Sequence, residues 1–422
     1  MESYRLENIH VIPEKKGFQE FSKVSYPIRY GRFSEIQTPD YTFQFNLNGE
    51  IKFIQGRGQN WPHPGEWLKR TIGNDWLYYS AGSYNGIIDI IGEYYYPCLP
   101  YPSNSLFNGY GIDTAIKNDA IHAWASLQSN LSMRVSASRS NNLNECLARI
   151  AQNDIGTLQH RSNQYPDLIN GHITVLPPDS RHVDYETIPV IIADGCLYHC
   201  GFCRVKSAGG FMPRSRADIL EQIEQLKKFY GRDIYNYNSV FLGQHDTLMT
   251  ETALIEFTAL KAHQLFEFEH SNLKNPSLFL FGSVDSLLGS DESKFSALNR
   301  LPFKTYLNLG LESVDPETLD VLKKPITSEK VKDAFIRTIE LNKKYERVEI
   351  SVNFVLGEGL AIGHLPSLLD LVRNSLDRFY SKGAVYLSPL IGSNNKKELL
   401  RQFYRVKTMS RFPVYIYLIQ RL

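Results

Sequence analysis

The chain has 422 residues, with 46 lysines and arginines against 45 aspartates and glutamates, which gives a net charge of +1 at pH 7. This balance favours neither nucleic acid nor an anionic membrane as an obligatory partner. Five cysteines, three of them clustered, do not form the pattern of a disulfide framework, and no apolar run is long enough to span a bilayer. We therefore expect a cytoplasmic globular protein without a signal peptide, large enough for two domains.

Residues 1–185 differ in composition from the rest, because all four tryptophans lie there. The segment 41–54 alternates aromatic and polar side chains on both sides of Asn48-Gly49, which predicts a β-hairpin with a tight turn. Residues 66–70 predict the start of a helix. Two further helices are predicted at 113–129 and 144–152. We expect an aromatic-rich α+β region that binds substrate or a partner.

The stretch between Trp76 and Pro102 is rich in aromatic residues and prolines. Two interpretations are open: a core packed with aromatic side chains, and a wall that stacks on a flat or sugar-like substrate or on bases. No basic residue separates the aromatics between Tyr78 and Tyr101, which favours the core and gives no clear nucleic-acid signature. Cys98 and Cys146 are interpreted as structural thiols.

The next feature is a cysteine loop at 196–203, where three thiols follow one another as C-x3-C-x2-C. An apolar run leads into it, and this run predicts a buried strand that ends at Asp194-Gly195. The spacing lets one loop place Cys196, Cys200 and Cys203 at three corners of a cuboidal 4Fe–4S cluster, and the fourth iron is left without a protein ligand. Phe202, just before the last thiol, shields such a cluster from water.

Zinc is the alternative for these thiols. Structural zinc prefers four ligands, usually as two separated pairs. His199 is the available fourth ligand, but it lies inside the loop and would strain it. The spacing favours the cluster.

This loop resembles the cluster loop of the radical S-adenosylmethionine (radical SAM) superfamily. In that family the open iron chelates the amino and carboxylate groups of the methionine moiety of S-adenosylmethionine (SAM). Several relatives carry an N-terminal cobalamin domain with an Asp-x-His-x-x-Gly motif. No such motif occurs here, since His10 and His63 lack its neighbours, so we do not expect cobalamin.

From about residue 186 the chain alternates apolar strands and amphipathic helices, which predicts a parallel sheet with helices outside it. Six strands are predicted at 188–194, 238–243, 277–283, 305–311, 348–356 and 384–390. Six helices are predicted at 216–230, 251–266, 291–299, 328–345, 364–379 and 395–408. The expected fold is α/β: a partial (βα)6 TIM-like barrel at 186–395 of the radical SAM type, an N-terminal α+β extension at 1–185, and a segment at 396–422 that closes the barrel.

In such barrels the chemistry lies at the carboxyl ends of the strands. The second strand ends with Gly243-Gln244-His245-Asp246, where many family members carry Gly-Gly-Glu or Gly-Asp to receive the SAM ammonium. Gly243 suits a close backbone approach, and the acid follows three residues later as Asp246, so Gln244 and His245 depart from the common pattern. Ser283, at the end of the third strand, is predicted either to contact SAM or substrate or to cap the next helix.

The fourth strand ends with Gly310-Leu311-Glu312-Ser313, followed by a helix that ends in Leu322-Lys323-Lys324. This pattern resembles the subgroup of coproporphyrinogen-dehydrogenase-like, methylthiotransferase-like and elongator-like radical SAM proteins. The resemblance implies that Glu312 approaches the SAM ribose or methionine; the alternative is a surface glutamate paired with Lys324. It further implies contacts to SAM from the fifth and sixth strands, at Asn353, Gly357, Ser388 and Leu390.

The resemblance implies a radical SAM enzyme. A reduced 4Fe–4S cluster cleaves SAM to methionine and a 5′-deoxyadenosyl radical, which takes hydrogen from an unidentified substrate, a small molecule or cofactor precursor. An electron donor such as flavodoxin or ferredoxin is expected as a partner. Two alternatives stay open: a non-catalytic iron–sulfur or haem-carrying chaperone of this fold, and a zinc-stabilised binding module.

Overall fold

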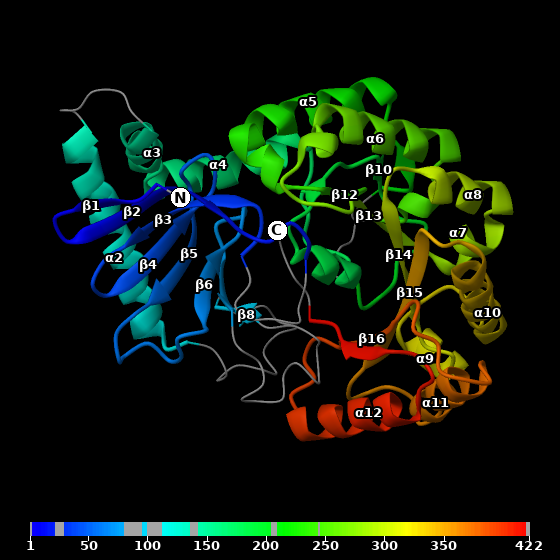
Figure 1. Cartoon of the computed structure of the whole chain (residues 1–422). Helices are drawn as coiled ribbons and strands as arrows, with labels where there is room; N and C mark the ends of the chain where they lie inside the picture. Colours follow the sequence, from blue (N-terminus) through cyan, green and yellow to red (C-terminus); the bar gives the residue numbers. More distant parts are fainter. Residues whose placement is uncertain are drawn as a thin grey trace.

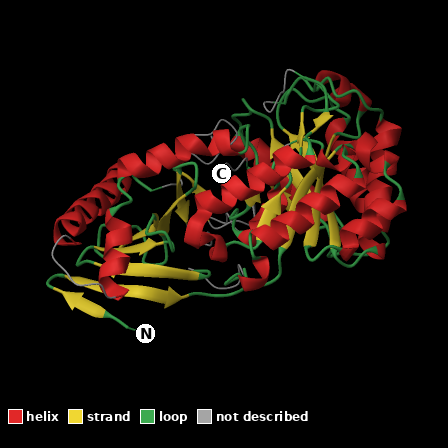
Figure 2. Ribbon diagram, turned by 90° about the horizontal axis from the view of Figure 1, so that it is seen from above, coloured by secondary structure: helices red, strands yellow, loops and turns green. Residues whose placement is uncertain are grey.

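A computed structural model describes residues 2–21, 29–79, 95–98, 112–135, 142–203, 209–243 and 245–418. Figure 1 shows two parts side by side, an antiparallel sheet with its helices and a parallel sheet surrounded by helices. The view from above in Figure 2 shows the same separation.

The amino-terminal part, in its described residues, is an antiparallel sheet of eight strands that pair in sequence order. These strands are β1 (Tyr4–Leu6), β2 (Ile9–Lys16), β3 (Arg32–Gln37), β4 (Tyr41–Phe45), β5 (Ile51–Gly56), β6 (Trp67–Arg70), β7 (Trp76–Tyr79) and β8 (Tyr95–Pro97). The predicted hairpin is confirmed, since β4 pairs with β5 and Gly49 in the turn between them has a φ of 84°. Most of the aromatic-rich stretch, 80–94 and 99–111, lies outside the described residues.

Helices α2 (Thr114–Val135) and α3 (Asn142–Ala151) pack against the sheet, and both predicted helices are confirmed. Trp124 and Leu147 from these helices join Phe43 and Ile54 from the sheet in one buried apolar core. Helix α4 (Ile155–Leu168) then leads the chain to the second part, where it contacts α5 (Arg216–Tyr230).

The helix predicted at 66–70 is wrong, because these residues form strand β6. Two of them, Lys69 and Arg70, are charged, yet they are only 2% and 8% exposed. Their charges are met inside the protein: Lys69 Nζ lies 2.7 Å from Glu186 Oε1, and Arg70 Nη2 lies 3.6 Å from Glu50 Oε2. Buried ion pairs therefore allow charged residues in an inner strand.

The second part contains a parallel sheet of seven strands among its described residues, in the order β17-β16-β15-β14-β13-β12-β9. The strands are β9 (Ile188–Pro189), β12 (Ser239–Phe241), β13 (Ser277–Gly282), β14 (Lys304–Glu312), β15 (Val348–Leu356), β16 (Val385–Pro389) and β17 (Val414–Ile416). Six of them match the predicted strands, and β17 adds a seventh from the carboxy-terminal segment. Since β9 and β17 are both edges, the barrel is partial, and the predicted α/β fold is confirmed.

The first predicted strand, 188–194, is shorter than expected. Only Ile188–Pro189 joins the parallel sheet, whereas β10 (Ala193–Asp194) pairs antiparallel with β11 (Met212–Pro213). The chain thus leaves the parallel sheet early, and β10 and β11 form a short antiparallel pair on the two sides of the cysteine loop.

Helices lie outside the parallel sheet (Figure 1). After α5 they are α6 (Thr252–Leu265), α7 (Val284–Gly289), α8 (Glu292–Arg300), α9 (Pro316–Val321), α10 (Ser328–Lys344), α11 (His364–Asn374) and α12 (Lys396–Met409). Among the described helices, none is both long enough and apolar enough to cross a bilayer.

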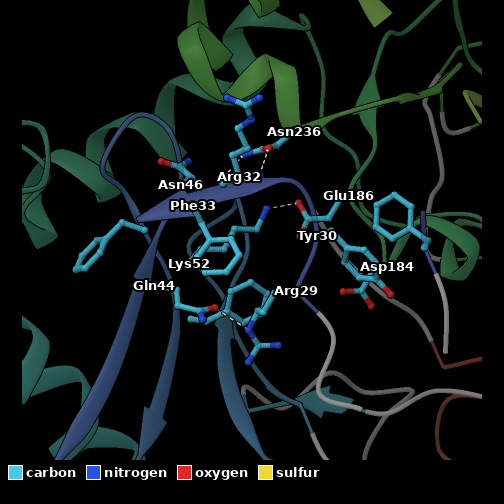
Figure 3. Close-up of a pocket in the computed structure, with 13 residues that line it drawn as sticks. Arg29, Tyr30, Arg32, Phe33, Gln44, Asn46, Lys52, Asp184, Glu186 and Asn236 are labelled. Atoms are coloured by element: carbon cyan, nitrogen blue, oxygen red, sulfur yellow. Dashed lines mark hydrogen bonds and ion pairs between the residues drawn. The ribbon is translucent and has the colours of Figure 1, made fainter. Parts of the chain in front are cut away.

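The two parts meet at the amino-terminal ends of the barrel strands. Glu186, two residues before β9, receives Lys52 Nζ at 2.8 Å. Asn236, in the turn before β12, accepts a hydrogen bond from the Arg32 backbone N–H at 2.8 Å. Figure 3 shows these contacts around a small hollow of about 40 Å³. Two polar contacts in its lining, Lys52 with Glu186 and Arg32 with Asn236, hold the two parts together.

Candidate functional site

A larger cavity, of about 290 Å³, lies at the carboxyl ends of the barrel strands. Its lining residues come from the cysteine loop and from the ends of strands β12 to β17. They are Val175, Cys196, Tyr198, His199, Cys200, Phe202, Cys203, His245, Asp246, Phe281, Gly282, Ser283, Asn308, Gly310, Glu312, Lys324, Asn353, Val355, Ser388, Pro389, Leu390, Ile391 and Tyr417. Of the described residues in 1–185, only Val175 reaches this cavity.

Alternation along the strands explains which residues face the cavity. On β14, Asn308, Gly310 and Glu312 are two residues apart and therefore share one face. On β15 the same rule places Asn353 and Val355 on the inner face. The strands bring these residues together because β14 and β15 pair in parallel, with Gly310 opposite Asn353.

The cysteine loop is held at two points. Tyr198 donates a hydrogen bond from its hydroxyl to Asp285 Oδ2 at 2.7 Å and accepts one from the Asp285 backbone N–H at 3.1 Å. The Gly201 backbone N–H donates to the Leu322 carbonyl at 2.9 Å. These contacts fix the loop to the start of α7 and the end of α9.

All three thiols line the cavity, with Cys200 buried and the other two half-buried. Within the described residues, no three His, Cys, Asp or Glu side chains converge on one metal-ion position. A cuboidal cluster places each thiolate on a different iron, so its ligands surround a volume rather than a point.

Burial raises the pKa of Cys196 and of Cys200. The cation of Lys324 acts in the opposite direction on both, because a nearby positive charge favours the thiolate. Thiolates are the form that binds iron.

Asp246 is the second notable feature of the cavity. It is 4% exposed, and its Oδ1 accepts the Ser283 backbone N–H at 3.1 Å. Its Oδ2 is buried and has no hydrogen-bond partner among the described residues. Burial raises the pKa of Asp246, although hydrogen bonds from Ser283 and Ser286 oppose this. A buried carboxylate oxygen without a donor is rare and fits a cationic ligand group in the cavity.

Ser283 lines the cavity and also caps α7, since its Oγ accepts the Ser286 backbone N–H at 3.0 Å. Both predicted roles of Ser283 are thus compatible with its position. Gln244 lies outside the described residues. Gly243 and Gly357 do not line the cavity, but they have φ values of 76° and 147° and form the turns after β12 and β15.

Glu312 is paired with Lys324, whose Nζ lies 3.4 Å from Glu312 Oε1. The pair is not at the surface, as the alternative interpretation required, but buried in the cavity wall, with Glu312 9% and Lys324 8% exposed. Glu312 has a φ of 65° at an irregularity in the β14–β15 pairing. Burial raises its pKa, and Lys324 opposes that rise.

Four polar residues around the cavity were not singled out as ligand contacts from the sequence: Asn308, Lys324, Tyr198 and Tyr417. Asn308 carried a usable signal, because it is polar within an apolar strand and lies in phase with Glu312. Tyr417 could not be found this way, since it follows a strand that the pattern did not predict.

A family model described as the radical SAM superfamily matches residues 190–372. No curated protein matches the chain. Among solved structures, a radical SAM methyltransferase from Sphaerobacter thermophilus is 15% identical, and the match covers 54% of this chain and 64% of that one at a TM-score of 0.36.

Two further structures are similar at the same level. One is a cobalamin-dependent S-adenosylmethionine radical enzyme with aqua-cobalamin bound. It is 14% identical, and the match covers 53% of this chain and 31% of that one at a TM-score of 0.34. The other is coproporphyrinogen III oxidase from Escherichia coli. It is 13% identical, and the match covers 53% of this chain and 51% of that one at a TM-score of 0.35. The chain spans less than two thirds of the length of these three proteins. Residues 190–372 are thus a radical SAM domain, and enzymes of that superfamily use a 4Fe–4S cluster and S-adenosylmethionine.

Proposed function

We propose that this protein is a radical SAM enzyme with a single 4Fe–4S cluster held by Cys196, Cys200 and Cys203. The observation that supports this most directly is the cavity, which combines the three thiols with an unpartnered buried carboxylate oxygen on Asp246. The thiols would bind three iron atoms, and the carboxylate would bind the cationic end of a ligand beside the fourth.

SAM fits this arrangement by its charge pattern. Asp246 Oδ2 would accept hydrogen bonds from the SAM ammonium, which supplies the missing donor. Glu312 would accept the ribose hydroxyls, and Lys324, whose ammonium has three N–H donors and lies 3.4 Å from Glu312 Oε1, would also donate to a carboxylate of the ligand. Asn353, Ser388 and Leu390 would line the remaining SAM surface.

When bound together, the reduced cluster and SAM supply a one-electron cleavage to methionine and a 5′-deoxyadenosyl radical that abstracts hydrogen from substrate. The protein's own contribution is to orient and to exclude water. Phe202 covers the cluster loop on the cavity side, and Tyr198 with Gly201 holds that loop in place. A small external electron donor such as flavodoxin or ferredoxin would supply the electron.

The substrate would be a small molecule or cofactor precursor that enters the part of the cavity lined by apolar side chains. These are Val175, Phe281, Val355, Ile391 and the ring of Tyr417. Cobalamin is not part of this proposal. The described part of residues 1–185 is an antiparallel sheet, whereas cobalamin domains of this family are doubly wound.

The test is electron paramagnetic resonance of the anaerobically reconstituted, dithionite-reduced protein with and without SAM. We expect a reduced 4Fe–4S signal that changes shape when SAM is added, and formation of 5′-deoxyadenosine and methionine. A cluster signal that is indifferent to SAM would favour the chaperone alternative. Zinc with no cluster would contradict the proposal.

A further inference from the structure

A buried chain of hydrogen bonds runs from the floor of the cavity to the opposite end of the barrel. At the floor, the Asn353 Nδ2 group donates to Asn308 Oδ1 at 2.6 Å, and Asn308 Nδ2 donates to Asn353 Oδ1 at 3.1 Å. Asn308 Nδ2 also donates to Ser351 Oγ at 2.7 Å. Ser351 Oγ in turn donates to Asp179 Oδ2.

Asp179 belongs to a short 3₁₀ segment, Pro178–Val183, which we call the plug. The plug contacts β13 and β14 from inside the barrel. Asp179 is 2% exposed, and its other oxygen accepts the Tyr386 hydroxyl at 2.8 Å. Tyr386 also accepts a hydrogen bond from Arg181 Nε at 2.9 Å, so its hydroxyl both donates and accepts.

The direction of each hydrogen bond follows from the bond between Ser351 and Asp179. An ionised carboxylate only accepts, so the Ser351 hydroxyl hydrogen must point at Asp179. Ser351 Oγ can then only accept from Asn308, which places the Asn308 nitrogen toward Ser351 and its oxygen toward Asn353. If the Asn308 amide were rotated by 180°, one of its N–H groups would face an N–H group of Asn353, unless the Asn353 amide were rotated as well.

We propose that Asp179 is a positioning residue, which acts through Ser351 and Asn308 to set which atoms of the Asn353 amide face the bound SAM. This inference rests on the proposed function. Asn353 is the half-buried member of the chain, and its amide keeps one N–H and one lone pair for the cavity. The three buried residues of the chain, Asp179, Ser351 and Asn308, fix which atoms of the Asn353 amide face the cavity.

The arrangement is sensitive to pH. Burial raises the pKa of Asp179 to about 6, although the Ser351 hydrogen bond and the Arg181 charge oppose the rise. The titratable or charged groups around it are Arg181 and His182 on the plug, Tyr306 on β14, Glu349 on β15, Tyr386 on β16, and Tyr417. Glu349 raises the Asp179 pKa further, but it is itself paired with Lys304 at 3.0 Å. Below this pKa the protonated carboxyl can donate, and the direction of the chain is no longer fixed.

The experiment measures the SAM dissociation constant of the reconstituted protein at pH 7.5 and pH 5, from the SAM-dependent change of the reduced cluster signal. The variants are Asp179→Asn and Ser351→Ala, and the ratio of variant to wild-type dissociation constant is compared at each pH. For Asp179→Asn we expect a ratio of about 5 to 10 at pH 7.5 that falls toward 1 at pH 5, since a lost oriented hydrogen bond has about this effect. Taking a ratio removes the contribution of other groups that titrate in the cavity.

The matched control is Asp233→Asn. Asp233 is also 2% exposed and burial raises its pKa to about 6 as well, but it lies at the junction of the two parts and not in this chain. Its ratio should stay near 1 at both pH values. Ser351→Ala should show the loss at pH 7.5, which keeps the test valid if Asp179→Asn folds poorly.

Equal SAM affinity in wild type and both variants at pH 7.5 would overturn the inference, as would a loss of the same size at both pH values. If the wild-type protein assembles its cluster but does not respond to SAM, the proposed function fails and the inference falls with it.

Discussion

Glu186, half-buried at the junction of the two parts, and Asp246, buried in the cavity, are carboxylates with opposite surroundings. Although burial works to raise it, Lys52 and Lys69 lower the pKa of Glu186 to about 2. Burial dominates at Asp246, whose pKa is raised, and one of its oxygens has no partner. The charge of Glu186 is thus compensated within the protein, whereas that of Asp246 is not compensated by the described residues.

This difference separates a structural charge from a ligand-binding one. A buried charge that is fully paired stabilises an interface, whereas a buried acceptor left open costs stability unless a ligand supplies the donor. Native proteins keep few such open groups, and they concentrate at functional sites. The following variants test this contrast, from the largest expected effect to the smallest.

Replacing Cys196, Cys200 or Cys203 with alanine should abolish both cluster assembly and SAM cleavage, because a cuboidal cluster loses one of its three protein ligands. Iron content and 5′-deoxyadenosine formation after anaerobic reconstitution measure the two effects. Cys98→Ala is the control and should retain both. Normal SAM cleavage in the variant lacking all three thiols would refute the assignment.

Glu186→Gln should lower the free energy of unfolding near neutral pH by about 3 kcal/mol, because it removes the carboxylate that pairs with the half-buried Lys52 and one of the two that pair with the buried Lys69. Since the folded-state pKa lies below the ordinary 4.5, the stabilisation is fully present above pH 4.5 and is lost as the pH falls toward 2. Urea unfolding across this pH window measures it.

Glu398→Gln is the control for that variant. Glu398 also has a pKa lowered to about 2, by hydrogen bonds from Arg401 and Gln402, but it is exposed and its pairing is screened by solvent. We expect no measurable change in stability. A loss equal to that of Glu186→Gln would contradict the distinction between the two sites.

Asp246→Asn should weaken SAM binding about tenfold or more while leaving stability unchanged or slightly higher at pH 8. The amide keeps the acceptor for Ser283 but replaces the open carboxylate oxygen that would meet the SAM ammonium. Because the folded-state pKa of Asp246 is raised, its ionisation destabilises the fold as the pH rises through that pKa, and the variant removes this cost. A large drop in the unfolding midpoint with unchanged SAM affinity would reverse the roles assigned to the two carboxylates.

Gly310→Ala should weaken SAM binding severalfold with the fold retained. A Cβ at this position would lie 2.4 Å from Glu312 Oε1, so the carboxylate must move out of its place beside Lys324. Gly289→Ala, at the end of α7 where a Cβ would meet nothing within 4 Å, is the control. Equal SAM affinity in the two variants would show that the position of Glu312 does not matter for binding.

Much of the barrel could be predicted from the sequence, because each strand and helix carries its own local periodicity. The six strands and the cysteine loop fall where the pattern placed them, apart from the early end of the first strand. Strand β6 was missed because Lys69 and Arg70 have their partners in other elements, and no local pattern reveals a buried ion pair.

The candidate site could likewise be predicted only in part from the sequence. The spacing of the cysteines determined, by itself, the three-thiolate loop, and the strand order determined which ends would meet. Only the tertiary structure decided that Glu312 and Lys324 are buried together, that Asp246 keeps an open oxygen, and that Asp179 reaches Ser351 across 172 residues of sequence. Such contacts depend on sheet register and on how a loop enters the barrel, which are set by packing between distant segments rather than by local propensity.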